Sequence, residues 1–236
     1  MTLNHWMKTN YKKLNIFMFS GLLLFTSNVK AMGGWISGGG EFITDQQNPW
    51  FLQNTKQVNY CVLVDEPNFG MSEADVKNSI QSAIQSWKSA FTEVKSWGQI
   101  GTFSLKLGTQ DFVYQNECDD STDIRFQFGV LTAEQLEKVP NPKNHVGFSI
   151  RTQYDSVNMK GRGFVYISPE KGPLALAALK SGEPLWSSKN IFAGLYFVGV
   201  LNHELGHIFG LPHSENIFVM REDFPTDIVN NILQNG

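Results

Sequence analysis

Basic residues, cysteine and histidine are all scarce in this chain of 236 residues. It has 19 lysines and arginines against 22 aspartates and glutamates, which gives a formal net charge of −3, and only two cysteines and five histidines. Nucleic acids and anionic membranes are bound through basic patches, so the shortage of basic residues argues against both as partners. No internal repeat or low-complexity tract is present, and a chain of this length fits one domain with a sizeable core.

The first 31 residues have the composition of a signal peptide. Three lysines precede a short apolar run, Ile16 to Phe25, and the small residues Val29 and Ala31 follow at the positions that a signal peptidase reads. The run is too short to span a bilayer comfortably, so a retained membrane anchor is the less favoured alternative. The chain could equally start at Met7, which would give a signal of more usual length. We therefore predict an exported protein, secreted or periplasmic, with no membrane contact after signal cleavage.

Removal of residues 1–31 makes the predicted mature chain more acidic. It takes away four lysines and no acidic residue, which leaves 15 basic and 22 acidic side chains and a net charge of −7. Residues 32–57 are rich in glycine, asparagine and glutamine, which predicts an extended N-terminal lead with little regular structure. Residues 58–236 then form the predicted folded domain, which we expect to be a monomer.

Cys61 and Cys118 both lie in the predicted mature chain. In an oxidising compartment an even pair of cysteines forms a disulfide more often than two free thiols. Such a bond would close a loop of about 57 residues and stabilise the fold by roughly 4 kcal/mol in the chain-entropy model. The alternative is a thiolate that binds a metal and keeps an enzyme latent. That alternative needs a cysteine in a pro-segment, and residues 32–57 contain none.

Periodic patterns predict an α+β domain. From Ser72 to about Lys95, apolar residues recur three and four apart, and Ser72 with Asp75 forms a variant of the capping box, which predicts a long amphipathic helix. Runs rich in β-branched and aromatic residues predict five strands, at residues 58–64, 103–107, 124–128, 146–152 and 163–168. Shorter helical turns are predicted at 132–139 and 174–179, and a last helix starts at Pro225.

Three of the five histidines stand close together in the sequence HELGHIFGLPH at residues 203–213. On a helix, His203 and His207 lie one turn apart on the same face and can offer two imidazoles to one metal ion. Glu204 is displaced by one residue, so its carboxylate reaches a water on that ion rather than the ion itself. Gly210 can adopt positive φ and end the helix, and the turn could bring back His213 as a third ligand. Three protein ligands with a fourth position left for water are the arrangement of a catalytic zinc site.

A helix whose histidines only line a core is the alternative, but the glycine and the third histidine make a chance match much rarer. The pattern His-Glu-x-x-His-x-x-Gly-x-x-His resembles the zinc signature of the metzincin metallopeptidases, and Ser214 after the third histidine is similar to the matrixin branch. The resemblance implies a zincin-like α+β catalytic domain: a twisted, mixed five-stranded sheet with a long helix, a zinc-binding active-site helix and a C-terminal helix. It also implies that Met220, the only methionine after His213, forms a tight Met-turn as an apolar floor beneath the imidazoles.

Further metal sites have little support in the sequence. His145 is the only other histidine of the predicted mature chain, which is too few for the structural second zinc of animal matrixins, and we expect it at the surface or hydrogen-bonded. Three aspartates crowd one loop, where a solvated acidic turn is favoured over a calcium site: Asp119, Asp120 and Asp123. The last helix has a single aspartate, Asp227 after Thr226, where matrixins usually have two, so the family's pairing with the mature N-terminus is not implied here.

The resemblance implies a secreted endopeptidase with one catalytic zinc, acting on proteins or peptides. Neutral imidazoles leave zinc its full positive charge, which activates a bound water and polarises a peptide carbonyl, while Glu204 takes the proton and delivers it to the leaving amine. The substrate would pair with the edge strand at residues 146–152. The alternatives are a non-catalytic zinc-binding module of the same fold, against which the intact Glu204 speaks, and a zinc hydrolase acting on a non-peptide amide.

Overall fold

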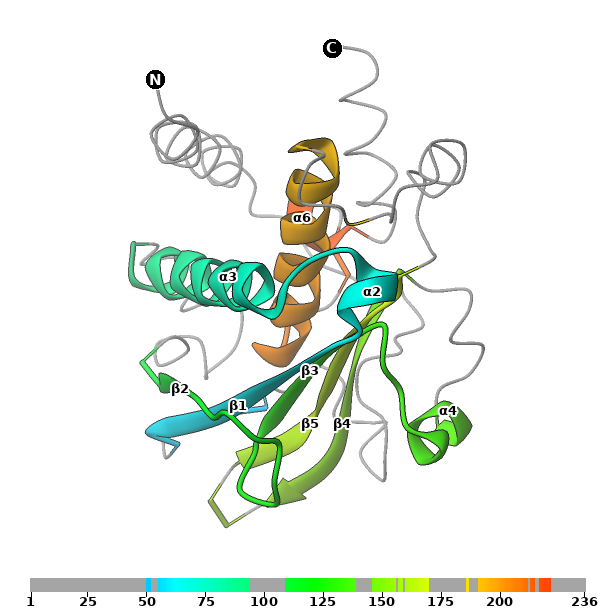
Figure 1. The fold of residues 1–236 in the computed structure, drawn as a ribbon. Helices are drawn as coiled ribbons and strands as arrows, with labels where there is room; N and C mark the ends of the chain where they lie inside the picture. The colour runs from blue at the N-terminus through cyan, green and yellow to red at the C-terminus, as the bar shows by residue number, and fades with distance from the viewer. Residues whose placement is uncertain are drawn as a thin grey trace.

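The computed structural model describes residues 50–51, 55–93, 109–138, 146–155, 157–158, 160–169, 186, 191–211, 213–214 and 217–221. A single five-stranded sheet with helices packed on it makes up most of this part of the chain (Figure 1). Several predicted features lie outside the described residues: the signal peptide, most of the lead at 32–57, the strand at 103–107, His145, the turn at 174–179 and the last helix with Thr226 and Asp227.

The strands of the sheet follow the order β2-β1-β3-β5-β4. Four run parallel, and the edge strand β4 is antiparallel to its neighbour β5. Their bounds are Gln57–Val64 for β1, Asp111–Tyr114 for β2, Ile124–Phe128 for β3, Gly147–Asp155 for β4 and Lys160–Ile167 for β5. All except β2 lie where alternating or apolar runs predict strands. β2 is not predicted: three of its four residues, DFVY, are β-formers, but the run is too short to show a period. The mixed five-stranded sheet confirms the predicted α+β class.

Two long helices pack on one face of the sheet and form the main core. α3 (Glu73–Glu93) begins as the capping pattern predicts, because the Asp75 N–H donates to the Ser72 hydroxyl at 3.2 Å. α6 (Ile191–Ile208) carries the histidine motif and runs upright past the end of α3 in Figure 1. The inner side chains of both helices and of β1, β3 and β5 belong to one buried cluster. Phe148, Ile150, Phe164 and Tyr166 form a separate cluster on the opposite face of β4 and β5.

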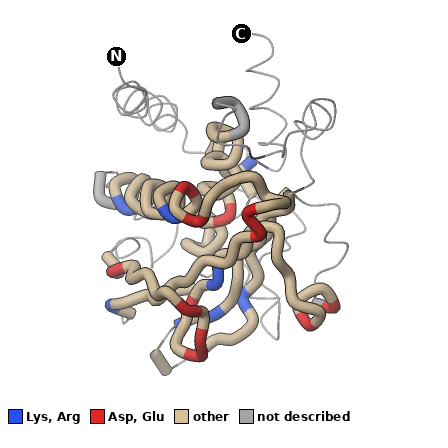
Figure 2. Tube along the Cα trace, in the orientation of Figure 1, with Lys and Arg blue, Asp and Glu red and all other residues tan. Residues whose placement is uncertain are grey.

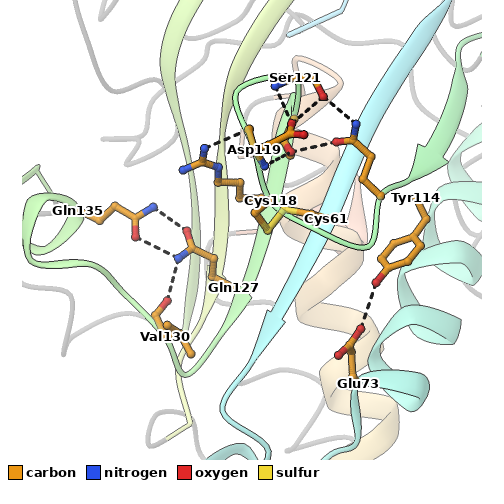
Figure 3. The surroundings of a disulfide bond; sticks show 12 residues. Cys61, Glu73, Tyr114, Cys118, Asp119, Ser121, Gln127, Val130 and Gln135 are labelled. Atoms are coloured by element: carbon orange, nitrogen blue, oxygen red, sulfur yellow. Dashed lines mark hydrogen bonds between the residues drawn. A yellow bond between two sulfur atoms is a disulfide. The ribbon is translucent and has the colours of Figure 1, made fainter.

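Short helices complete the described structure. α4 (Ala133–Lys138) lies at the predicted turn and is fastened to the sheet by a reciprocal amide pair, because Gln127 and Gln135 each donate to the other's side-chain oxygen, at 3.0 and 2.7 Å (Figure 3). α2 (Glu66–Phe69) directly follows β1 and is not predicted from the sequence; it has a single turn, too short for a visible period. The 3-10 helix η5 (Phe218–Met220) comes after α6.

The predicted disulfide is present: Cys61 on β1 and Cys118 in the loop before β3 are bonded, with their Cα atoms 5.3 Å apart (Figure 3). The three aspartates that follow do not gather around one point. Asp119 and Asp120 are exposed, whereas Asp123 is fully buried and forms a 2.8 Å ion pair with Lys160 on β5. The prediction of a solvated turn is therefore wrong for Asp123, whose ion pair connects the loop to β5. The loop offers no support for a calcium site.

Trp50 and Phe51, in the predicted lead, are part of the core, and each residue is only 2% exposed. The Trp50 N–H donates to the Ile208 carbonyl at 2.8 Å, and the Gly161 N–H donates to the Trp50 carbonyl at 2.6 Å. Phe51 forms a β-bridge with Lys160. This part of the lead thus joins the end of α6 to the start of β5, although the glycine-rich composition around it predicts little structure.

The charges of the described residues are dispersed. Lysines and arginines alternate with acidic residues along the trace and form no continuous basic run (Figure 2). No helix in the described part of the chain has the length and apolar character needed to cross a membrane.

Candidate metal centre

The last turns of α6 present two histidines on one helical face. His203 and His207 are 8% and 6% exposed, and their Nε2 atoms lie 3.1 Å apart. The chain after the helix brings in the third histidine, whose Nε2 lies 3.2 Å from that of His203. One nitrogen from each ring therefore converges on a common point, and all three lie within 4.8 Å of one another.

A glycine turn makes this convergence possible. Gly210 has φ of 85°, the left-handed conformation that favours glycine. Its N–H donates to the His207 carbonyl and the Leu211 N–H donates to the Gly206 carbonyl, each at 2.9 Å, the bond pair of a Schellman motif. The helix therefore ends as the sequence predicts, and the chain reverses toward the two helical histidines.

Backbone carbonyls fix the tautomers of the two helical histidines. His203 Nδ1 lies 2.7 Å from the Val219 carbonyl oxygen, and His207 Nδ1 lies 2.8 Å from that of Leu211. A carbonyl oxygen only accepts, so each Nδ1 carries the proton and each Nε2 of a neutral ring carries a lone pair. The lone pairs of His203 and His207 then face each other across 3.1 Å, an arrangement that a cation between them would stabilise.

The electrostatic environment keeps both helical imidazoles neutral. Burial lowers the pKa of His203 to about 4, and burial together with the neighbouring His203 lowers the pKa of His207 well below its ordinary value. The neutral ring is the form that binds a metal. Burial has the opposite effect on the acid beside them, raising the pKa of the Glu204 carboxyl to about 8. A cation at the three Nε2 atoms would counter that rise, because positive charge favours the carboxylate.

The donor set and its spacing fit zinc. Imidazole nitrogen is a preferred zinc ligand, and tetrahedral zinc with Zn–N bonds of about 2.0–2.1 Å separates two nitrogens by about 3.3 Å. The two Nε2 separations of 3.1 and 3.2 Å are close to that value. Among the described residues, no other group of three histidine, cysteine or acidic side chains is placed to hold a metal ion.

Met220 packs against the turn of α6 that carries this cluster. It is fully buried, and its sulfur fills the space against Gly206, where an added Cβ would collide with it. The same turn is tied to the third histidine, because the Ser214 N–H donates to the Met220 carbonyl at 2.9 Å. The turn thus supports His203 through the Val219 carbonyl and is joined to Ser214, the neighbour of His213, contacts that fit the predicted Met-turn.

The model of the matrixin family matches residues 49–225, which is well over half of the chain. The chain belongs to the matrixin family. No curated protein is similar enough in sequence to count as a match. Matrixins are metallopeptidases with a catalytic zinc, so membership supports a zinc-dependent metallopeptidase that acts on proteins or peptides. The predicted relationship and the predicted fold are therefore both confirmed.

Some contacts around the metal centre of this matrixin are not predicted from the sequence. The carbonyls of Leu211 and Val219 carry no sequence signal, since every residue has one. Trp87 on α3 donates its indole N–H to the Asn202 carbonyl at 3.0 Å. The two residues are 115 positions apart, so no local pattern predicts this bond. Gly206 had a readable signal, because glycine inside a helix costs about 1 kcal/mol relative to alanine and often marks a close approach.

Proposed function

We propose that this matrixin is an exported zinc endopeptidase in which His203, His207 and His213 hold the metal and Glu204 is the general base. The observation that carries the proposal is the convergence of the three Nε2 atoms. In the two histidines on α6, a backbone carbonyl also holds the Nδ1 atom. Zinc, when bound there, would supply positive charge that acidifies a water and polarises the scissile carbonyl.

The surroundings of Glu204 support its proposed role as the general base. It follows His203 on α6, is 4% exposed, and faces the edge strand β4, since a Cβ added to Gly147 would lie 3.1 Å from Glu204 Oε1. A carboxylate held there accepts the proton of the attacking water and later delivers it to the leaving amine. β4 pairs only with β5 in the described sheet, so its other edge is suited to bind an extended substrate backbone by strand addition.

The test is cleavage of unfolded casein by the purified protein, with and without a zinc chelator. We expect cleavage that stops on chelation and returns with added zinc. Glu204→Ala should keep one zinc per chain and lose about 10²–10⁴-fold in rate, while Glu117→Ala, the same truncation at an exposed loop position, should leave the rate unchanged. Normal turnover by Glu204→Ala would refute the mechanism. A wild-type protein that binds zinc without cleaving casein would indicate a binding module or a hydrolase of non-peptide amides.

Export is the second part of the proposal. It is supported by the signal-like composition of residues 1–31 and by the disulfide, a bond that persists in oxidising compartments. Expression of the full chain followed by cell fractionation and N-terminal sequencing should find the protein outside the cytoplasm, starting near Met32. Intact chain in the cytoplasm would contradict the proposal.

A further inference from the structure

The helix-facing side of β4 is unlike that of the other strands. Side chains of β1, β3 and β5 on this face are apolar and belong to the main core. Ser149 of β4 is paired in register with the core residue Val165 and is itself fully buried, so its hydroxyl is shielded from water. Burying a hydroxyl without a hydrogen bond is unfavourable, and a buried serine at this position therefore calls for a partner.

Glu204 lies against the same stretch of β4. A Cβ at Gly147 would be 3.1 Å from Glu204 Oε1 and 3.1 Å from Val200 Cγ1, so the absence of a side chain at Gly147 leaves the space that the carboxylate fills. Ser149 is two residues along and on the same face of the strand, and its hydroxyl is adjacent to the Glu204 carboxylate. Gly147 and Ser149 together form a cradle for this side chain.

Each member of the pair has an unused hydrogen-bonding atom. Ser149 Oγ and Glu204 Oε2 are both buried, and neither has a hydrogen bond of good distance and angle. One is a hydroxyl that can donate and the other a carboxylate oxygen that can accept. A hydrogen bond between them would satisfy both atoms.

We propose that Ser149 is a positioning residue: its hydroxyl donates to Glu204 Oε2 and holds the carboxylate in the orientation that leaves Oε1 for the attacking water. The neighbours of Glu204 one turn away on α6 do not orient the acid: three are apolar, and the fourth, His207, has its Nδ1 bonded to the Leu211 carbonyl. The cradle on β4 therefore connects the strand that would bind substrate to the base that would act on it. This inference rests on the proposed role of Glu204.

Kinetics of zinc-loaded Ser149→Ala and Ser149→Cys on labelled casein test the role. Both substitutions fit the space, but alanine has no donor and cysteine only a weak one. We expect kcat to fall roughly tenfold in Ser149→Ala, as for loss of a hydrogen bond to a charged group, with KM within twofold and zinc content unchanged. Ser86→Ala, which removes an α3 hydroxyl that donates to the Ser82 carbonyl, should keep wild-type kcat. A kcat within twofold of wild type in Ser149→Ala would overturn the proposal.

A crystal structure of the zinc-loaded full-length mature protein tests the contact independently of activity. Ser149 Oγ should lie within about 3.2 Å of a Glu204 carboxylate oxygen. A hydroxyl bonded elsewhere would overturn the inference even if the enzyme is active. If wild-type protein fails to cleave casein, the proposed function fails, while the distance still decides whether Ser149 and Glu204 interact.

Discussion

Substitution of Gly206 by alanine sets two opposing effects on stability against each other: the helix propensity of alanine and its packing against Met220. Alanine is favoured over glycine inside a helix by about 1 kcal/mol. At Gly206, however, the new Cβ would collide with the Met220 sulfur and lie 3.0 Å from Met220 Cε and 3.1 Å from Trp87 Cζ2. Met220 and Trp87 are buried, and forcing a methyl group into a packed core costs about 1–3 kcal/mol.

Gly194 provides a matched control on the same helix. A Cβ at Gly194 would meet nothing within 4 Å, so Gly194→Ala should raise the free energy of unfolding by about 1 kcal/mol. The helical preference is common to both substitutions. Gly206→Ala should therefore be less stable than Gly194→Ala by the packing cost alone, about 1–3 kcal/mol, in urea unfolding of zinc-stripped protein.

The same substitution should weaken zinc binding. Displacement of Met220 would move the turn whose Val219 carbonyl accepts from His203 and whose Met220 carbonyl accepts from Ser214. Loss of such supporting bonds typically lowers metal affinity 10–100-fold, which a competition titration against a chelator measures, whereas Gly194→Ala should keep wild-type affinity. Equal stability and equal zinc affinity in the two variants would refute the packing argument.

Two further predictions concern the third ligand and the disulfide. His213→Ala should reduce zinc content after dialysis, because two imidazoles remain where three converge, and full occupancy would remove His213 from the site. Reduction of the Cys61–Cys118 bond in zinc-stripped protein should lower the free energy of unfolding by up to about 4 kcal/mol, measured in urea. No other cysteine exists for the reductant to act on, and unchanged stability would show that the bond adds nothing to the fold.

Local sequence patterns predict most helices and strands, and most of the metal centre, because the repeat of a helix or strand decides which residues share a face. The four-residue spacing of His203 and His207 places both rings on one helical face, and a glycine three residues later provides the positive φ that ends the helix. The same reasoning finds α3 from its apolar stripe and capping serine. Each of these inferences needs only residues within a few turns of one another.

Features that depend on contacts between distant segments are not readable in this way. β2 is a four-residue edge strand stabilised by pairing with β1. Gln57 of β1 is paired with Asp111 of β2, 54 residues later in the sequence. Asp123 resembles its exposed neighbours in sequence, and only the position of Lys160 makes it a buried ion pair. Ser149 likewise follows the alternation of an ordinary strand until the fold sets Glu204 beside it.

The hydrogen bond from Trp50 to Ile208 has a consequence for the order in which the molecule is completed. All five strands precede α6 in the sequence, and a nascent chain emerges from its N-terminus. A growing chain therefore has every strand of the sheet before it has any metal ligand, and Trp50 must wait about 158 residues for its acceptor. The residues that would cut peptide bonds are made after all five strands, so a nascent chain that ends before α6 has a sheet but no means of cutting.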